Sequence, residues 1–401
     1  MYAFSVSGFG LTSVTIPSSV TSIGEGAFRH CLGLISIIIP SSVTSIEERA
    51  FSACSSLINI SVDSKNPAYT SVDGVLFDKD MHTLIQYPPA KIGETYIIPS
   101  SVTVIMATAF EDCSSLTDIT IPSSVTSIGL WAFANCISLT SIALPPSVTS
   151  IGELTFAGCI SLTSVTMPPL VTSIGLWAFA SCISLTSITI PSSVILIGEK
   201  AFSACTRLTN ISVDNGNSAY TSVDGVLFDK NIHTLIQYPL AKIGEIYIIP
   251  LSVISIEVGA FARSNLTDVT IPPSVTSIGK EAFAWSPLTS ITIPSLVTFI
   301  EDIAFVGCTR LINITVANEN PAYTSVDGVL FDKNIYTLIQ YPPAKIGSTY
   351  TVPLSVTSIR ENAFAFSNLK SVTLSREISL HSGIVGLPPI IPSHTKIIYS
   401  D

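Results

Sequence analysis

The sequence predicts a repeat solenoid, a β-rich stack of short coils, and three observations lead to this prediction. A repeat of 22 or 23 residues returns along most of the 401-residue chain, which is typical of stacked architectures. Proline and glycine recur at the same places in each repeat. Hydrophobic residues make up 47% and charged residues only 11%, so the chain can bury a large core. The short repeats begin at Leu11, Leu34, Leu116, Leu139, Leu162, Leu185, Leu266 and Leu288.

Each repeat follows the pattern L-x-x-I-x-I-P-x-x-V-x-x-I-G-x-x-A-F-x-x-C-x-x. Apolar residues at repeat positions 1, 4 and 6 predict one short strand per coil, and β-branched residues favour that state. The proline at position 7 ends the strand because it cannot donate a backbone hydrogen bond. Valine and isoleucine at positions 10 and 13 belong to a second extended segment. The alanine and phenylalanine at positions 17 and 18 then fill the core, which only stacked coils can close.

Three longer repeats, of 58 or 59 residues, carry nearly identical inserts at about residues 63–99, 214–250 and 317–353. The segments "GVLFD" and "TLIQYP" predict two strands, and "DKD" or "DKN" between them predicts the turn of a hairpin. We therefore expect three β-hairpin inserts within one continuous solenoid. The longer repeats begin at Leu57, Leu208 and Leu311.

The repeat pattern, together with the "DGVLFDK…TLIQYP" insert, resembles the BspA-like (treponemal-type) leucine-rich repeat over about residues 11–370. The resemblance implies a solenoid at residues 11–374, with a partial repeat from a truncated N-terminus at 1–10 and a degenerate cap or tail at 375–401. It also implies a non-catalytic protein-binding or adhesion protein that recognises host, matrix or cell-surface proteins. Such proteins are mostly secreted or on the cell surface. No signal peptide is visible in this chain, so an intracellular interaction scaffold is the alternative.

The sequence shows no constellation for catalysis, for a cofactor or for a metal ion. The histidines have no fixed partner, and motifs for nucleophilic catalysis or phosphate binding are missing. The acidic residues of the inserts lack the spacing of a calcium loop, and turn formation explains them well. The net charge of −10 argues against nucleic acid, and no apolar run is long enough to span a bilayer.

Eight cysteines stand three residues after the phenylalanine of their repeats, so they predict a ladder of small buried thiols. The spacing of neighbouring rungs also allows a disulfide bond between their cysteines. Four sequons, whose use the sequence does not decide, begin at Asn59, Asn210, Asn265 and Asn313. The cysteines are Cys31, Cys54, Cys113, Cys136, Cys159, Cys182, Cys205 and Cys308.

The outward positions of the predicted strand form a ladder of uncharged hydroxyl groups, the first candidate surface. Solubility and β-propensity explain such a ladder without a ligand, whereas a solenoid also uses this face to bind proteins. A glycan- or ice-binding array is the remote alternative. The candidate residues of this ladder are Thr117, Thr120, Thr140, Thr163, Thr166, Thr186 and Thr189.

The second candidate surface is an apolar edge at repeat positions 15 and 16, which are polar or small in most repeats. In the central repeats these positions become Leu130 and Trp131, Leu154, and Leu176 and Trp177. We expect these side chains to line up along the stack as an interface for an unidentified protein ligand. The alternative is that both indoles fold back over their own turns and cover the core. The oligomeric state cannot be read from the sequence.

Overall fold

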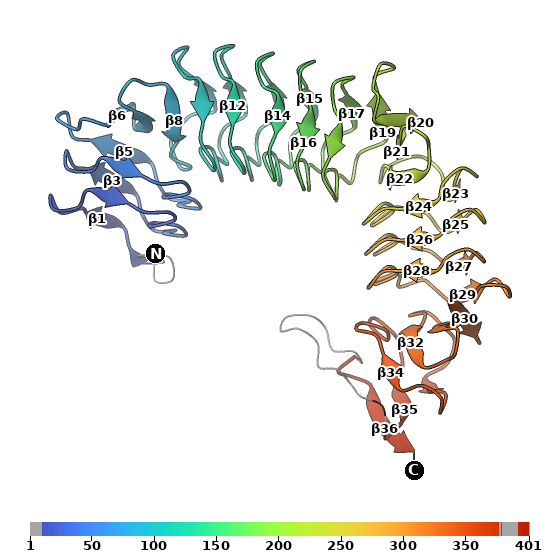
Figure 1. The fold of residues 1–401 in the computed structure, drawn as a ribbon. Helices are drawn as coiled ribbons and strands as arrows, with labels where there is room; N and C mark the ends of the chain where they lie inside the picture. Colours follow the sequence, from blue (N-terminus) through green and yellow to red (C-terminus); the bar gives the residue numbers. More distant parts are fainter. Residues whose placement is uncertain (1–9, 377, 379–391, 401) are drawn as a thin grey trace. The chain divides into compact units, whose positions relative to one another are not determined.

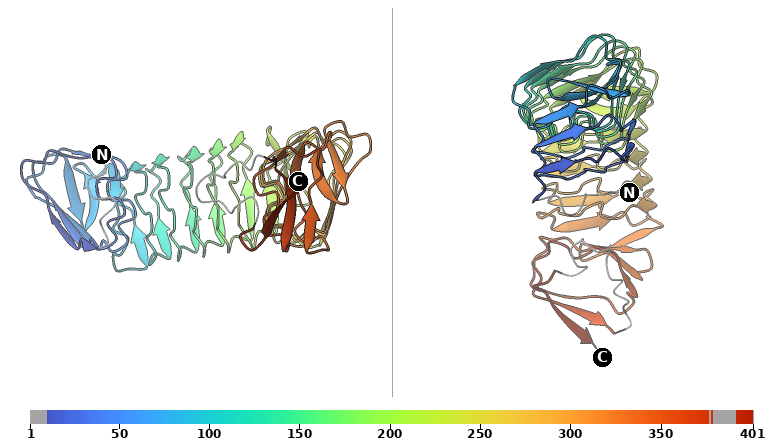
Figure 2. Two further views of the ribbon diagram at one scale, coloured as in Figure 1. Left: turned by 90° about the horizontal axis from the view of Figure 1, so that it is seen from below. Right: turned by 90° about the vertical axis from the view of Figure 1, so that its left-hand side faces the viewer.

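The computed structural model of the protein describes residues 10–376, 378 and 392–400, which divide between two compact units, residues 1–219 and 220–401. The expected partial repeat at 1–10 lies outside the described residues except for Gly10, as does much of the tail at 375–401. In each compact unit short strands lie side by side in successive coils (Figures 1 and 2). Within the described residues the structure contains no helix, and so none that could span a membrane.

The first compact unit has two ladders of parallel strands, named here A and B, where one strand per coil was expected. Partners lie one repeat apart, as in Ser141↔Ser164 on ladder A and Ile151↔Ile174 on ladder B. The second strand forms because the extended segment places its Ser-Ile pair in register with the next coil. Ladder A comprises β1 (Ser13–Thr15), β3 (Ser36–Ile39), β5 (Asn59–Val62), β9 (Thr95–Ile97), β11 (Asp118–Thr120), β13 (Ser141–Ala143), β15 (Ser164–Thr166), β17 (Ser187–Ile190) and β19 (Asn210–Val213). Ladder B comprises β2 (Ser22–Ile23), β4 (Ser45–Ile46), β10 (Val104–Ile105), β12 (Ser127–Ile128), β14 (Ser150–Ile151), β16 (Ser173–Ile174) and β18 (Leu196–Ile197).

The second compact unit repeats this arrangement. The partners Ile291↔Ile314 pair on ladder A and Ile256↔Ile278 on ladder B. Ladder A comprises β23 (Ile246–Ile248), β25 (Asp268–Thr270), β27 (Ser290–Ile293), β29 (Asn313–Val316), β33 (Thr349–Thr351), β35 (Ser371–Ser375) and β36 (Lys396–Ser400). Ladder B comprises β24 (Ser255–Ile256), β26 (Ser277–Ile278), β28 (Phe299–Ile300) and β34 (Ser358–Ile359).

Each insert forms three antiparallel strands, one more than the expected hairpin. In the first insert these are β6 (Tyr69–Val72), β7 (Val75–Asp78) and β8 (Thr83–Gln86). The turn between β6 and β7 forms because Asp73 and Gly74 both adopt positive φ angles, 48° and 80°, as a two-residue hairpin turn requires. The other inserts contain β20 (Tyr220–Val223), β21 (Val226–Asp229) and β22 (Thr234–Gln237), and β30 (Tyr323–Val326), β31 (Val329–Asp332) and β32 (Thr337–Gln340).

The acidic residues of the inserts stabilise turns. Asp78 Oδ1 accepts a hydrogen bond from the Thr83 amide at 2.9 Å, and Asp229 and Asp332 repeat this contact in their own inserts. Among the residues that the structure describes, no group of three or more histidine, cysteine, aspartate or glutamate side chains is placed to hold a metal ion. The geometry therefore favours turn formation over the calcium interpretation.

A buried asparagine joins each insert to the coil before it. The Asn66 side chain donates to the carbonyls of Pro40 and Val43 at 2.8 and 2.9 Å, and its Oδ1 accepts from the amides of Ala68 and Tyr69 at 2.8 Å. Asn320 makes the same four contacts in the second compact unit. Since four backbone groups depend on one side chain, the asparagine fixes the start of the insert against the preceding turn.

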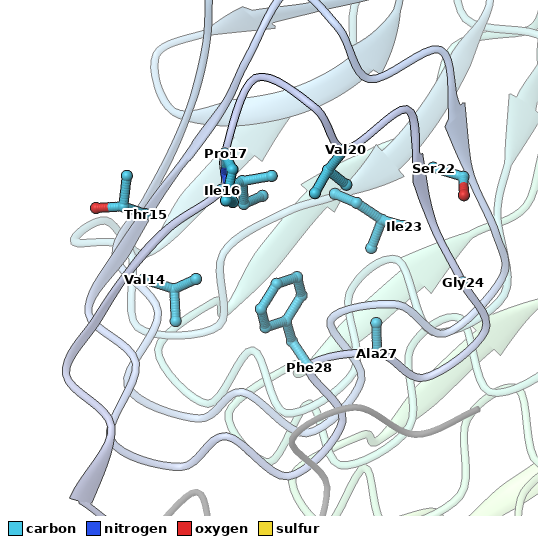
Figure 3. Close-up of a pocket in the computed structure, with 10 residues that line it drawn as sticks. All are labelled: Val14, Thr15, Ile16, Pro17, Val20, Ser22, Ile23, Gly24, Ala27 and Phe28. Atoms are coloured by element: carbon cyan, nitrogen blue, oxygen red, sulfur yellow. The ribbon is translucent and has the colours of Figure 1, made fainter.

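The turn that contains the Ala-Phe pair, which the repeats share, closes the core of each coil. The phenylalanines are buried and stack on one another, with ring centroids 5.3 Å apart for Phe156 and Phe179. After the first insert Tyr87 takes the phenylalanine position and stacks on Phe110 at 5.3 Å. At the N-terminal end of the described stack, Val14, Phe28 and their neighbours line a cavity of about 290 Å³ (Figure 3).

The eight cysteines are free and buried, which confirms the expected ladder of thiols. The thiol of Cys136 donates to the Phe110 carbonyl of the preceding coil at 3.2 Å, and Cys205 makes the same contact with Phe179 at 3.1 Å. Burial raises the pKa of the Cys205 thiol to about 12, so it stays protonated at neutral pH. In three repeats serine takes this position, as Ser286 does, whose hydroxyl lies 2.6 Å from the Phe283 carbonyl and 3.2 Å from the Phe261 carbonyl. These contacts assign the cysteines a structural role.

Candidate interaction surface

Leu130, Trp131, Leu154, Leu176 and Trp177, which we name the tryptophan edge, lie on three consecutive coils of the first compact unit. Backbone hydrogen bonds connect the coils at these positions. The Trp131 amide donates to the Glu153 carbonyl at 3.0 Å, and the Leu154 amide donates to the Leu176 carbonyl at 3.0 Å. The structure thus brings the five apolar candidates together along one edge of the stack.

The tryptophan edge is partly exposed to solvent. Trp177 is 43% exposed, Leu130 39% and Leu176 38%, while Trp131 and Leu154 are half-buried. Neither indole is fully covered, so folding back over the turn leaves part of each ring available. The Lys200 ammonium lies 5.6 Å from the centre of the Trp177 ring, a distance at which a cation and an aromatic face attract each other.

The residues at repeat position 16 adopt left-handed backbone conformations. The φ angles of Trp131, Leu154 and Trp177 are 62°, 54° and 57°. This region disfavours side chains with a Cβ and favours glycine, and Gly26 and Gly259 do occupy the same repeat position in other coils. Most other coils also have a non-glycine residue in this conformation, so the left-handed backbone is a feature of the repeat, and the large apolar side chains are what sets these coils apart.

The apolar surface extends further than the sequence indicated. Ile195 and Leu196, one coil beyond Trp177, are 63% and 59% exposed where other repeats have threonine and serine. Leu196 pairs with Ser173 on ladder B, which places it beside the last coil of the tryptophan edge. The departure of these two residues from the Thr-Ser pattern was the signal that could have found them.

The threonine candidates lie within the strands of ladder A or directly before them, apart from the tryptophan edge on their coils, and several of their hydroxyl groups donate hydrogen bonds within the fold. The Thr117 hydroxyl donates to the Glu94 carbonyl, the Thr140 hydroxyl to the Thr117 carbonyl and the Thr163 hydroxyl to the Thr140 carbonyl, at 3.0, 3.3 and 3.0 Å. A hydroxyl proton used in this way is not available to a ligand. The ladder thus connects one coil to the next.

The remaining threonine candidates are exposed on the same ladder. The Thr186 carbonyl accepts a hydrogen bond from the Thr209 hydroxyl of the following coil, and the hydroxyls of Thr189 and Ser212 share a hydrogen bond of 3.0 Å. Thr166 and Thr189 line a shallow pocket of about 330 Å³ with Asp214, whereas Thr120 is an exposed residue of β11.

A second aromatic group, in the second compact unit, was not predicted from the sequence. Trp285 and Phe366 meet in a T-shaped contact with ring centroids 4.9 Å apart, and the guanidinium of Arg263 lies 5.7 Å from the Trp285 ring. A Cβ at Gly307 would come within 2.5 Å of the indole, so only glycine leaves room for it. The group joins coils on either side of the third insert, which makes it a structural contact.

The sequons differ in accessibility. The Asn59 amide donates to the Ser61 hydroxyl at 2.8 Å, and a Cβ at Gly74 would come within 2.5 Å of its Oδ1. Asn313 faces Gly328 in the same way, whereas Asn265 is exposed. Asn59 and Asn313 are therefore part of the packing between β-strand and insert.

Comparison with known proteins relates most of the chain to one repeat family. Residues 1–82, 92–209, 132–242, 238–343 and 347–382 match a region described as BspA type leucine-rich repeat. A leucine-rich cell surface protein from Faecalibacterium prausnitzii is 27% identical, with a TM-score of 0.52, covering 98% of this chain and 88% of that one. A leucine-rich repeat protein from Eubacterium ventriosum is 23% identical, with a TM-score of 0.54, covering 83% and 91%. Among curated proteins none matches this chain.

Proposed function

Because the chain belongs to the BspA-type leucine-rich-repeat family, we propose that it is a non-catalytic protein-binding solenoid that recognises a protein ligand through the tryptophan edge. We further propose that it acts in adhesion at a cell surface or after secretion. The similarity to a cell surface protein from Faecalibacterium prausnitzii supports this location. The observation that carries the proposal is the row of large apolar side chains that stay partly exposed on three consecutive coils.

Tryptophan and leucine that only filled the core would be covered, yet Trp177 keeps 43% of its surface in solvent. Tryptophan is also enriched among the residues that dominate binding energies at protein interfaces. The hydroxyl ladder supports binding less strongly, since Thr117, Thr140 and Thr163 use their protons within the stack.

A binding assay with a paired variant tests the proposal. Purified chain is presented to an array of matrix and cell-surface proteins, and dissociation constants are measured for every protein that binds. We expect the Trp131→Gly/Trp177→Gly variant to bind at least about tenfold more weakly, because truncating a central aromatic residue of an interface costs more than about 1 kcal/mol.

The matched control is Ile38→Ala/Ile97→Ala, which removes two exposed apolar side chains from ladder A of the same compact unit. This control should bind as the unmodified chain does. Circular dichroism confirms that both variants are folded. Unchanged binding by the folded glycine variant, or an equal loss in the control, would show that the tryptophan edge is not the binding surface.

A further inference from the structure

On the coils of the tryptophan edge, apolar and acidic residues alternate at repeat position 15. Repeat position 15 holds Leu130, Glu153, Leu176 and Glu199 on four consecutive coils. The first and third of these coils add a tryptophan at the next position, so large apolar pairs recur at every second coil with a carboxylate between them. The side chain of Glu153 is half-buried and that of Glu199 is exposed.

The spacing of this pattern is close to the rise of an α-helix over seven residues, about two turns. Neighbouring parallel strands lie about 4.7–4.9 Å apart, so two coils span about 9.6 Å. A helix rises about 10.5 Å over seven residues, and residues seven apart lie on the same face. The difference is about 1 Å over two coils, which flexible side chains can absorb. An extended peptide fits worse, since its same-face residues recur at about 6.7 or 13 Å.

We propose that the tryptophan edge receives an amphipathic helix of a protein partner, lying along the stack of coils. This inference rests on the proposed function and specifies the partner. Two large apolar residues of the helix, seven positions apart, contact the pairs Leu130–Trp131 and Leu176–Trp177. A lysine or arginine midway between them, on the same face, lies against Glu153.

Charge complementarity selects a basic residue at that middle position. The chain has a net charge of −10, and the carboxylate of Glu153 stands between the two apolar pairs. A like charge there would be repelled, whereas a cation forms an ion pair at the interface. On the coil that carries Glu199, the next residue is Lys200, whose ammonium lies over the Trp177 ring. The preference for a basic residue of the partner is therefore weaker at Glu199. Glu153 is therefore the residue that discriminates.

Three fluorescent alanine-rich helical peptides test the inference. The first carries two leucines seven residues apart with a lysine midway on the same face, and the second replaces that lysine with glutamate. The third has the composition of the first, with one leucine moved to the opposite face. By fluorescence anisotropy at low salt we expect the first to bind about tenfold more tightly than the second or third, with the charge preference shrinking at high salt.

The Glu153→Lys variant should reverse the order of the first two peptides. The matched control is Glu48→Lys, which changes a glutamate at the same repeat position three repeats earlier and should leave the order unchanged. Equal binding of all three peptides, or the same order in Glu153→Lys, overturns the inference.

The outcomes also separate this inference from the proposed function. If no peptide binds while Trp131→Gly/Trp177→Gly still loses its protein ligand, the helical partner is wrong and the binding surface stands. If that variant keeps its ligand, the binding surface is wrong and the helical partner falls with it.

Discussion

Replacing both tryptophans of the edge with glycine should give a more stable protein than replacing both with alanine. Alanine is the better residue in most regular structure, because glycine loses more backbone entropy on folding. At Trp131 and Trp177 the order reverses, because their φ angles of 62° and 57° lie in the region that penalises a Cβ. The loss of indole packing is common to both variants and cancels in the comparison.

The magnitude follows from two opposing terms. A Cβ in the left-handed region costs about 1–2 kcal/mol per residue. The additional entropy that glycine loses on folding offsets about 0.5–1 kcal/mol of this relief. The net gain of glycine over alanine is about 0.5–1 kcal/mol at each position, or about 1–2 kcal/mol for the pair, since the positions lie two coils apart and should add.

Urea denaturation followed by far-ultraviolet circular dichroism measures this difference in the free energy of unfolding. The control is Ala132→Gly/Ala178→Gly, one residue further along each turn, where both alanines are fully buried and outside the left-handed region. That pair should be less stable than the unmodified chain. An alanine variant as stable as the glycine variant, or more so, would refute the view that the tryptophans occupy strained positions.

Three further outcomes are expected. Asn320→Ala removes four hydrogen bonds to buried backbone groups and should cost about 4 kcal/mol of unfolding free energy at roughly 1 kcal/mol each, whereas the exposed Asn215→Ala should cost almost nothing. Desolvation raises the pKa of Glu111, which accepts a hydrogen bond from Ser52, so its protonation favours folding and this stability is lost as the pH rises through the raised pKa. Glu111→Gln should therefore be more stable than the unmodified chain at pH 7 and lose that advantage below the unfolded pKa near 4.5; a constant advantage across this range would contradict the assignment. The Cys205 thiol, with its pKa near 12, should react with a thiol reagent only in urea, and rapid modification of the native chain would show that the ladder is open.

The periodic features of the fold could be predicted because they depend on local chemistry that every repeat shares. Buried phenylalanines and cysteines follow from their fixed distance to the leucine that opens each coil. The hairpin strands β7 and β8 follow from short apolar runs on either side of a turn. A single repeat is a weak signal, but several copies in the same register leave few other folds.

Other features could not be predicted because they depend on contacts between distant residues. The meeting of Trp285 with Phe366 joins coils that the third insert separates in sequence. The two-residue strands of ladder B exist only through pairing with the next coil, since segments such as Ser150–Ile151 are too short to signal a strand alone. The hydroxyl bonds of Thr140 and Thr163 to neighbouring carbonyls are likewise visible only once the coils are stacked.

The candidate site could be predicted only in part from the sequence. The alternation of Leu-Trp with Glu-Leu was visible in the sequence, and equal coil spacing predicts that the side chains line up. The backbone conformation that holds them was not visible, because glycine, lysine and tryptophan at position 16 give no common signal. Gly26 and Lys200 adopt the same left-handed geometry as Trp177, with φ angles of 57°, 54° and 57°.

The hydroxyl ladder and the tryptophan edge differ in how far the fold alone explains their residues. Thr140 and Thr163 contribute to the fold through bonds that tie one coil to the next, so the fold alone accounts for their presence. The left-handed backbone at position 16 is shared by most other coils, whose residues there include arginine, lysine and glutamate. What distinguishes Trp131 and Trp177 is a large apolar ring that stays partly in solvent. The partial exposure of these large apolar rings thus favours the tryptophan edge over the threonine face as the surface that meets a partner.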